Sequence, residues 1–419
     1  MGWARKSVPA KKVEAVPNLV GLDLNATCAR AVLGPARVLP RAVPMDGDRD
    51  ELAMVLSLQG RHAEIGRAGA SVRRLLPHLV CQDFLSHLGE QHEWKAGRHR
   101  IDAARAVSLA FERVHRVCAE GEGMAVSVPS YLSRAQVMML CPLAERAGIS
   151  WLASVPAPLA AALAVYRNDP WSGLVLVVDA DDHAFTAAIV AADESQLITH
   201  TTQAWSHLHS RAWKGMLLNA VADRCIRQSR RDPRDCASAE QSLYEQIEDS
   251  LEKTAQGKTI ELLIQTDHWY QNLPFQPEDL NTYCAPLVGR VLEKIRELLK
   301  TIGVEQALSG VIVSRAVANL PGLLAALKNR FSEQSPSEPI ELSDDFGEDL
   351  LRDPGGAARV TVLPRQAFAQ AAHEVAVRVQ DGDLPRSYFD LALPLATGEP
   401  RSSTGAPPKK VFRLLSFDL

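Results

Sequence analysis

The sequence has no run of apolar residues near the length of about 18 that a membrane-spanning helix requires. Its basic first residues are not followed by the apolar stretch of a secretory signal peptide. With 419 residues, 46% hydrophobic and 23% charged, the composition is that of a globular chain with room for two or more domains. We therefore predict a cytoplasmic protein without a membrane partner.

Cysteine pairs with metal-ligand spacing are also missing. The seven cysteines are scattered and no two are arranged as CxxC, so they indicate reduced thiols rather than a zinc site. An excess of positive charge is lacking too, since the formal net charge is -4. Nucleic acids are bound by clustered lysine and arginine side chains. We therefore expect no nucleic-acid partner.

Apolar runs bounded by turn residues predict strands along most of the chain. These strands lie at 19–24, 29–35, 124–132, 150–155, 174–181, 185–193, 197–205, 259–266, 308–314 and 359–364. Amphipathic segments between them predict helices, with Ser133 as an N-cap, Pro158 in a first turn and Gly303 as a stop signal. These helices lie at 101–121, 134–147, 159–166, 212–254 with a break at 230–235, 277–303, 320–331 and 365–379.

Strands and helices follow the same order twice, which predicts an α/β protein with two lobes of similar plan. Such a duplication is typical of the actin and sugar-kinase architecture, in which a nucleotide lies in the cleft between the lobes. The predicted parts are a flexible leader at 1–17, a first lobe at 18–168, a second lobe at 169–361 with a helix-rich subdomain at about 212–300, a return helix at 362–385 and a linker-like tail at 386–419.

Motifs at four places in the chain make the comparison with a known family more specific. The segments AVSVPSYLSRAQ, AERAGI and SVPAPLAAALAVY follow one another between Ala125 and Tyr166. Three further segments, LVGLDLNATCARAVL, VVDADDHAFTAAI and GVIVSRAVANLPGL, stand at the expected spacing for two phosphate loops and an adenosine motif. Over residues 18–380 the chain resembles the nucleotide-binding domain of the DnaK-type 70-kDa heat-shock proteins.

The resemblance implies an actin-like two-lobed ATPase fold of duplicated ribonuclease-H-like domains, with ATP or ADP and Mg²⁺ in the cleft. Asp23 and Asp179 match the two aspartates that hold the hydrated Mg²⁺ in the family. Asn25, Ala26 and Thr27 occupy the first phosphate loop. In the family this loop contains glycine, which lets backbone N–H groups approach the phosphates closely.

The second phosphate loop departs further from the family pattern. Asp181, Asp182 and His183 replace three glycines there, and Ser314 and Arg315 replace the glycines of the adenosine motif. Carboxylates beside a triphosphate would repel it. A blander interpretation is that Asp181 and Asp182 form a solvated turn, rather than a metal site with His183.

Three further positions correspond to family residues. Glu248 matches a glutamate that lies on the adenine side in the family. Arg73 is a candidate for the position of the family's catalytic-type lysine, and Asp179 is the other catalytic candidate. Pro129 matches a proline that signals between the lobes and the peptide-binding domain in the family. A proline after a strand also simply ends the strand.

These observations leave three hypotheses for function. The first is a degenerate relative, a pseudo-ATPase that serves as a protein-interaction module and has a protein partner. The second is a working ATP-binding ATPase of the chaperone type, since Asp23, Thr27, Asp179 and Pro129 remain. The third is a sugar kinase or a cell-division relative of actin. About forty residues follow the helix that ends near Val379, so we expect no peptide-binding domain of the family's β-sandwich type.

Overall fold

The computed structural model describes residues 16–193, 195–303, 308–332 and 358–395. Most of the predicted leader and of the predicted tail, including its apolar end, lies outside these residues. Within the described part, no helix combines the length and the apolar character needed to cross a bilayer.

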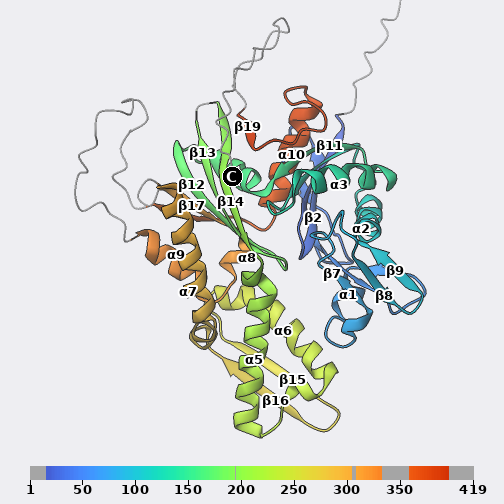
Figure 1. Cartoon of the computed structure of the whole chain (residues 1–419), viewed down its shortest axis with the longest axis vertical. Helices are drawn as coiled ribbons and strands as arrows, with labels where there is room; N and C mark the ends of the chain where they lie inside the picture. The colour runs from blue at the N-terminus through green and yellow to red at the C-terminus, as the bar shows by residue number, and fades with distance from the viewer. Residues whose placement is uncertain (1–15, 194, 304–307, 333–357, 396–419) are drawn as a thin grey trace, which may run out of the picture.

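Two large sheets form the centres of the two lobes (Figure 1). The first sheet consists of β1 (Asn18–Leu24), β2 (Cys28–Pro35), β3 (Arg41–Ala42), β4 (Glu51–Ala53), β10 (Gly123–Val128) and β11 (Trp151–Pro156). The second sheet consists of β12 (Gly173–Ala180), β13 (Phe185–Ala192), β14 (Gln196–Trp205), β17 (Leu308–Val313), β18 (Arg359–Val362) and β19 (Ala392–Pro394).

The two sheets share one topology. The first has the strand order β11-β10-β1-β2-β3, and the second has the order β18-β17-β12-β13-β14-β19. In each, an antiparallel pair is followed by two strands that add in parallel on the side of the first strand. This repetition confirms the predicted α/β class and the duplicated actin-like architecture.

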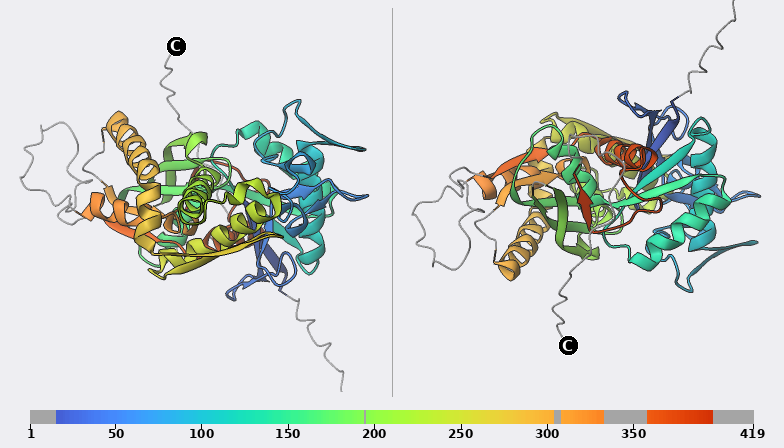
Figure 2. Two further views of the ribbon diagram at one scale, coloured as in Figure 1. Left: turned by 90° about the horizontal axis from the view of Figure 1, so that it is seen from below. Right: turned by 90° about the horizontal axis from the view of Figure 1, so that it is seen from above.

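Helices cover the sheets and join the lobes. They are α2 (Ala103–Val117), α3 (Arg134–Arg146), α4 (Ala157–Tyr166), α8 (Arg315–Ala318), α9 (Leu323–Ser332) and α10 (Ala367–Gln380). The helix α4 is apolar on all sides, which suits a helix enclosed by protein. One buried cluster contains residues of α4, α10 and both sheets. The view from above in Figure 2 shows α10 between the strands of the two lobes. The two lobes therefore share a core at this end of the molecule.

A helical subdomain extends from the second lobe. It consists of α5 (Ser210–Ser229), α6 (Ala237–Ala255), α7 (Pro277–Ile302) and the hairpin of β15 (Ile260–Gln265) and β16 (Tyr270–Phe275). The sequence predicts all of these except β16. The predicted stop of α7 is confirmed, since Gly303 caps it in the left-handed conformation with φ 71°.

A smaller extension of the first lobe was not predicted from the sequence. It consists of β5 (Val55–Ser57), β6 (Glu64–Ile65), α1 (Arg67–Ala70), β7 (Val80–Gln82), β8 (Glu93–Ala96) and β9 (His99–Asp102). These elements have two to four residues each, too few to establish a hydrophobic period.

The prediction of a linker-like tail from residue 386 is wrong for its first ten residues. The strand β19 pairs antiparallel with β14, and Tyr388 is buried beside Ala153 of β11. Leu393 is fully buried in the core that the two lobes share. The short apolar segment LALP carries too weak a pattern to be distinguished from a linker.

Candidate functional site

Two turns from different lobes meet where the nucleotide is expected. The first is the turn between β1 and β2, and the second is the turn between β12 and β13. The backbone N–H of Ala26 in the first turn donates to the Asp181 carboxylate in the second, at 2.9 Å. The N–H of Asp182 donates to the Thr27 hydroxyl at 2.8 Å. The sequence-predicted phosphate-loop residues are thus in direct contact with one another.

Asn25 fixes the shape of the first turn. Its side-chain oxygen accepts hydrogen bonds from the N–H groups of Thr27 and Cys28, each at 3.0 Å. Its own N–H donates to the Cys28 carbonyl at 3.1 Å. Asparagine favours such turns because its short amide can bond to the backbone two residues further on. Every backbone N–H of residues 25–28 therefore has a partner within the protein.

Asp181 organises the second turn. One carboxylate oxygen accepts from the N–H groups of His183 and Ala184, at 2.8 and 2.9 Å. The other accepts from Ala26 and, at 2.6 Å, from the hydroxyl of Tyr131. Turns that gather several N–H groups are anion sites. Here the anion is the protein's own carboxylate, which lies among N–H groups from both loops.

Burial raises the pKa of Asp181 to about 6, and the hydrogen bonds from Tyr131 and the backbone act in the opposite direction. The carboxylate is therefore mostly ionised at neutral pH. Burial also raises the pKa of the Tyr131 hydroxyl, and the charge on Asp181 raises it further. Tyr131 thus stays protonated and acts as a hydrogen-bond donor.

Asp182 is the centre of a buried group of charges. Its carboxylate lies 3.0 Å from the Lys214 ammonium and 3.4 Å from the Arg73 guanidinium, and all three side chains are about 5% exposed. Glu248 completes the group, 2.7 Å from Lys214 and 3.4 Å from Arg73. Burial alone would raise the pKa of Asp182, but Lys214 and Arg73 outweigh it and lower the pKa to about 2. Positive charge at this position is already neutralised by protein carboxylates.

The prediction of a solvated turn at 181–182 is wrong. Asp181 and Asp182 are only 5% and 4% exposed. The physical reason is that both carboxylates have partners supplied by α5 and by the first lobe, which the local sequence does not reveal. The structure does not bring together three or more metal-ligating side chains anywhere in its described ranges.

The two aspartates expected near Mg²⁺ lie on equivalent strands. Asp23 is buried near the end of β1, where Arg30 donates to it at 3.4 Å. Burial raises the pKa of Asp23 to about 7, which Arg30 partly opposes, and the nearby charge of Asp179 raises it further. Burial likewise raises the pKa of Asp179, opposed by a hydrogen bond from Ser314. The two carboxyls are close enough to influence each other, and Asp23 is about half protonated at neutral pH.

The residues expected at the adenosine side are engaged elsewhere. Ser314 is 2% exposed and caps α8, its hydroxyl accepting from the N–H of Val317. Arg315 donates to Glu252 of α6 at 2.6 Å, and Arg365 donates to the same carboxylate at 3.0 Å. Pro129 is buried directly after β10, and its carbonyl accepts from Leu132.

Several residues of the site were not found from the sequence. Lys214 lies on the apolar stripe of α5, three, four and seven residues before Leu217, Leu218 and Val221. A lysine in that position is a signal of a buried cation. His183 contacts Asp83 at 3.0 Å, and this hydrogen bond raises the pKa of the imidazole. Asp83 comes from a distant loop without any motif.

Comparisons with known proteins show which family this chain is similar to. A family model described as "Hsp70 protein" matches residues 115–344, more than half of the chain. The "Chaperone protein HscA" of Escherichia coli O7:K1 (strain IAI39 / ExPEC) is 26% identical over 251 residues, and so is that of Escherichia coli (strain K12 / DH10B). The aligned part covers 58% of this chain and 38% of each relative. The matched range of the family model contains the second turn, Lys214 and Glu248.

Proposed function

Since the chain belongs to the Hsp70 family, we propose that it is a chaperone-like protein that has kept the nucleotide-binding fold and lost ATP turnover. In this proposal it is a pseudo-ATPase that serves as a protein-interaction module with a protein partner. One observation carries the proposal. The N–H groups of both phosphate-loop turns are already bonded within the protein, with the Asp181 carboxylate among them.

Mg-ATP does not fit this arrangement. A phosphate needs free N–H groups and a local excess of positive charge. The N–H groups of the two turns bond to Asn25, Thr27 and Asp181. The Arg73 and Lys214 side chains bond to Asp182 and Glu248. Binding would have to break these buried contacts, and a buried carboxylate left without its partners costs several kcal/mol.

Contacts between the first lobe and the helical subdomain support the same proposal. Gln241 of α6 donates to the Ala70 carbonyl at 2.9 Å and accepts from the Arg74 N–H at 2.7 Å. The Arg74 guanidinium lies 4.8 Å from the centre of the Tyr244 ring. The helical subdomain is thus tied to the first lobe by hydrogen bonds of Gln241 to two backbone groups and by the packing of Arg74 against Tyr244.

The test is a calorimetric titration of the full chain with Mg-ATP and Mg-ADP, together with thermal unfolding at millimolar nucleotide. We expect no heat of binding and no shift. A ligand present at ten times its Kd would stabilise the protein by ~1.4 kcal/mol, which such a measurement detects.

A double variant sharpens the test. Asp181→Gly with Asp182→Gly removes both carboxylates and restores glycine in the second turn, so nucleotide binding should appear or strengthen. The exposed Asp267→Gly is the matched control for loss of charge. Binding by the unchanged protein tighter than about 100 μM, accompanied by turnover, would contradict the proposal.

A second candidate function is a working chaperone-type ATPase with altered loops. The observation that favours it is the pair Asp23 and Asp179, whose carboxyls lie close together at equivalent strand ends. Here turnover should be present in the unchanged chain and lost in Asp23→Ala and in Asp179→Ala. Phosphate release measured in the three proteins separates this candidate from the first.

A further inference from the structure

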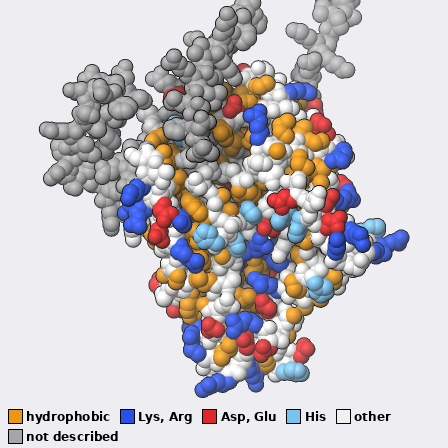
Figure 3. All heavy atoms as spheres, viewed as in Figure 1, with side chains coloured by type: hydrophobic (Ala, Val, Ile, Leu, Met, Phe, Trp, Pro, Cys, Tyr) orange, Lys and Arg blue, Asp and Glu red, His pale blue; other side chains and the backbone are white. Residues whose placement is uncertain are grey.

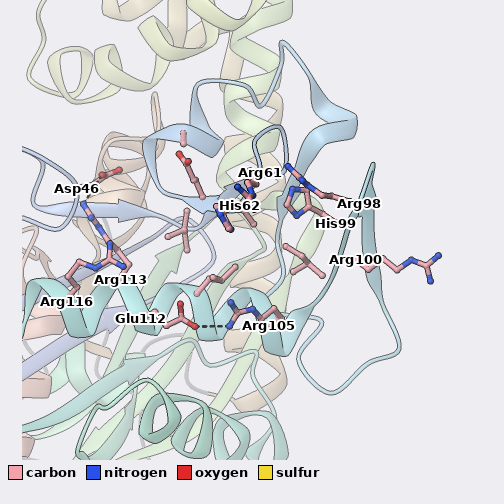
Figure 4. Close-up of a pocket in the computed structure, with 16 residues that line it drawn as sticks. Asp46, Arg61, His62, Arg98, His99, Arg100, Arg105, Glu112, Arg113 and Arg116 are labelled. Carbon is pink, nitrogen blue, oxygen red and sulfur yellow. Dashed lines mark hydrogen bonds and ion pairs between the residues drawn. The ribbon is translucent and has the colours of Figure 1, made fainter.

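A second cavity lies in the first lobe and takes no residue from the interlobe cleft. It has a volume of about 830 Å³ and is lined by α2, by β6 with the loop before it, and by the hairpin of β8 and β9. Figure 4 shows α2 along one side, with Arg61, His62, Arg98 and His99 across from it. Its size is within the range of sites that enclose a ligand.

Arginine dominates the lining of this cavity. The arginines are Arg61, Arg98, Arg100, Arg105, Arg113 and Arg116. Arg105 pairs with Glu112, and Arg113 pairs with Asp46. The other four have no ion pair among the described residues. Lys and Arg side chains gather at the corresponding edge of the molecular surface, over β8 and β9 (Figure 3). The cavity thus has guanidinium groups that are free to bind carboxylates or phosphates.

Two unpaired strand edges line the same cavity. Within the described residues β6 pairs only with β5, and β9 pairs only with β8. Residues of both strands face the cavity, and the His99 ring bonds to the Gly60 carbonyl at 2.9 Å across the gap. An exposed strand edge is a template for an added strand.

The lining also contains apolar side chains. Ile65, Ile101 and Leu109 come from β6, β9 and α2, and Ile101 is 5% exposed. Inorganic phosphate would gain nothing from the apolar side chains. A peptide with alternating acidic and apolar residues would use both the apolar side chains and the strand edges, since successive side chains of a strand point to opposite faces.

We propose that this cavity binds an extended acidic segment of a protein partner, with its carboxylates on Arg61 and Arg98 and its backbone along β6 or β9. The inference extends the proposed interaction role to a partner class and to a surface outside the cleft. Nucleotide titration tests the cleft and peptide titration tests the cavity, so either proposal can fail alone.

The experiment measures fluorescence anisotropy of a fluorescein-labelled peptide of alternating glutamate and valine, titrated with the full chain. A peptide of alternating lysine and valine is the control ligand. In the protein, Arg61→Glu with Arg98→Glu should weaken binding of the acidic peptide by about tenfold or more. The matched control, Arg37→Glu with Arg296→Glu, reverses two exposed arginines elsewhere and should leave binding unchanged.

Two additions separate the peptide from a simple anion. Methylation of alternate backbone nitrogens in the acidic peptide should weaken binding about fivefold, because the strand-edge hydrogen bonds are lost. Inorganic tripolyphosphate is titrated as the probe for a phosphate ligand. Thermal unfolding shows that each protein variant is folded.

Three outcomes would overturn the proposal. They are the absence of acidic-peptide binding to the folded chain, an unchanged affinity in the Arg61 and Arg98 variant, and tight binding of tripolyphosphate without binding of the peptide. The last outcome would assign the cavity to a small phosphate compound.

Discussion

Two aspartates of the candidate site have pKa values that are shifted in opposite directions. Asp182 has two cationic partners and a lowered pKa, whereas Asp23 is buried with a single guanidinium, that of Arg30 at 3.4 Å, and has a raised pKa of about 7. A raised folded-state pKa means that the folded protein holds the proton more tightly than the unfolded chain does. Asp23 and Asp182 therefore affect the pH dependence of stability with opposite signs.

The raised pKa of Asp23 predicts how the stability of the protein depends on pH. Its stabilising contribution is complete below the ordinary pKa of 3.8 and is lost as the pH rises through about 7. Asp23→Asn should remove this dependence, so between pH 5 and 8 the unchanged protein should lose about 2 kcal/mol more stability than the variant does. Chemical denaturation at several pH values measures both curves. The exposed Asp267→Asn is the control, and parallel curves for Asp23→Asn and the unchanged protein would contradict the prediction.

The candidate site could be predicted only in part from single residues. Asp23, Thr27, Asp179 and Glu248 were identified from their match to family motifs. The burial of Asp181 and Asp182 could not be predicted, because their partners Tyr131, Lys214 and Arg73 are far away in the sequence. The local sequence predicts a turn, but tertiary packing determines which distant side chains contact that turn.

Among the elements, long helices and central strands were predicted well. Ser133 caps α3 with a reciprocal bond to Gln136, as its position before an apolar period indicates. The short strands between β4 and α2 were not predicted. They depend on pairing with one another rather than on their own periodicity. The cavity proposed for peptide binding lies in this region, so it could not be predicted from the sequence.

The contact between β1 and α10 gives a prediction at the scale of elements. A Cβ atom on Gly21 would lie 2.0 Å from the Ala369 carbonyl oxygen and 2.4 Å from the His373 nitrogen, both backbone atoms of α10. Gly21→Ala should therefore destabilise the protein by about 3 kcal/mol, since the helix must move away from the sheet. Urea denaturation measures the loss.

Gly289 of α7 is the matched control for this substitution. A Cβ there meets no atom within 4 Å, and the residue is exposed in a helix. Gly289→Ala should therefore stabilise the protein by about 0.5–1 kcal/mol. If Gly21→Ala left the free energy of unfolding unchanged, α10 would not pack against β1 as closely as these distances require.

At the scale of the whole molecule, the arrangement of the two lobes depends on buried charges as well as on the shared core. Arg73 belongs to the first lobe, Asp182 to the second, and Lys214 and Glu248 to the helical subdomain. Breaking one member of such a group leaves an unpaired buried charge, which is far more costly than removing both partners. Opening the cleft would therefore expose several charges at once.

A double-mutant cycle tests this coupling between the lobes. Arg73→Met alone and Asp182→Asn alone should each destabilise the protein by about 3 kcal/mol, because each leaves a buried charge without one of its partners. Together they should cost about 2 kcal/mol less than the sum, since the two residues are in contact. Denaturation of the four proteins gives the coupling energy directly. A sum that is simply additive would mean that Arg73 and Asp182 do not couple the lobes, and other contacts, such as those of Asp181 and Gln241, would then hold the lobes together.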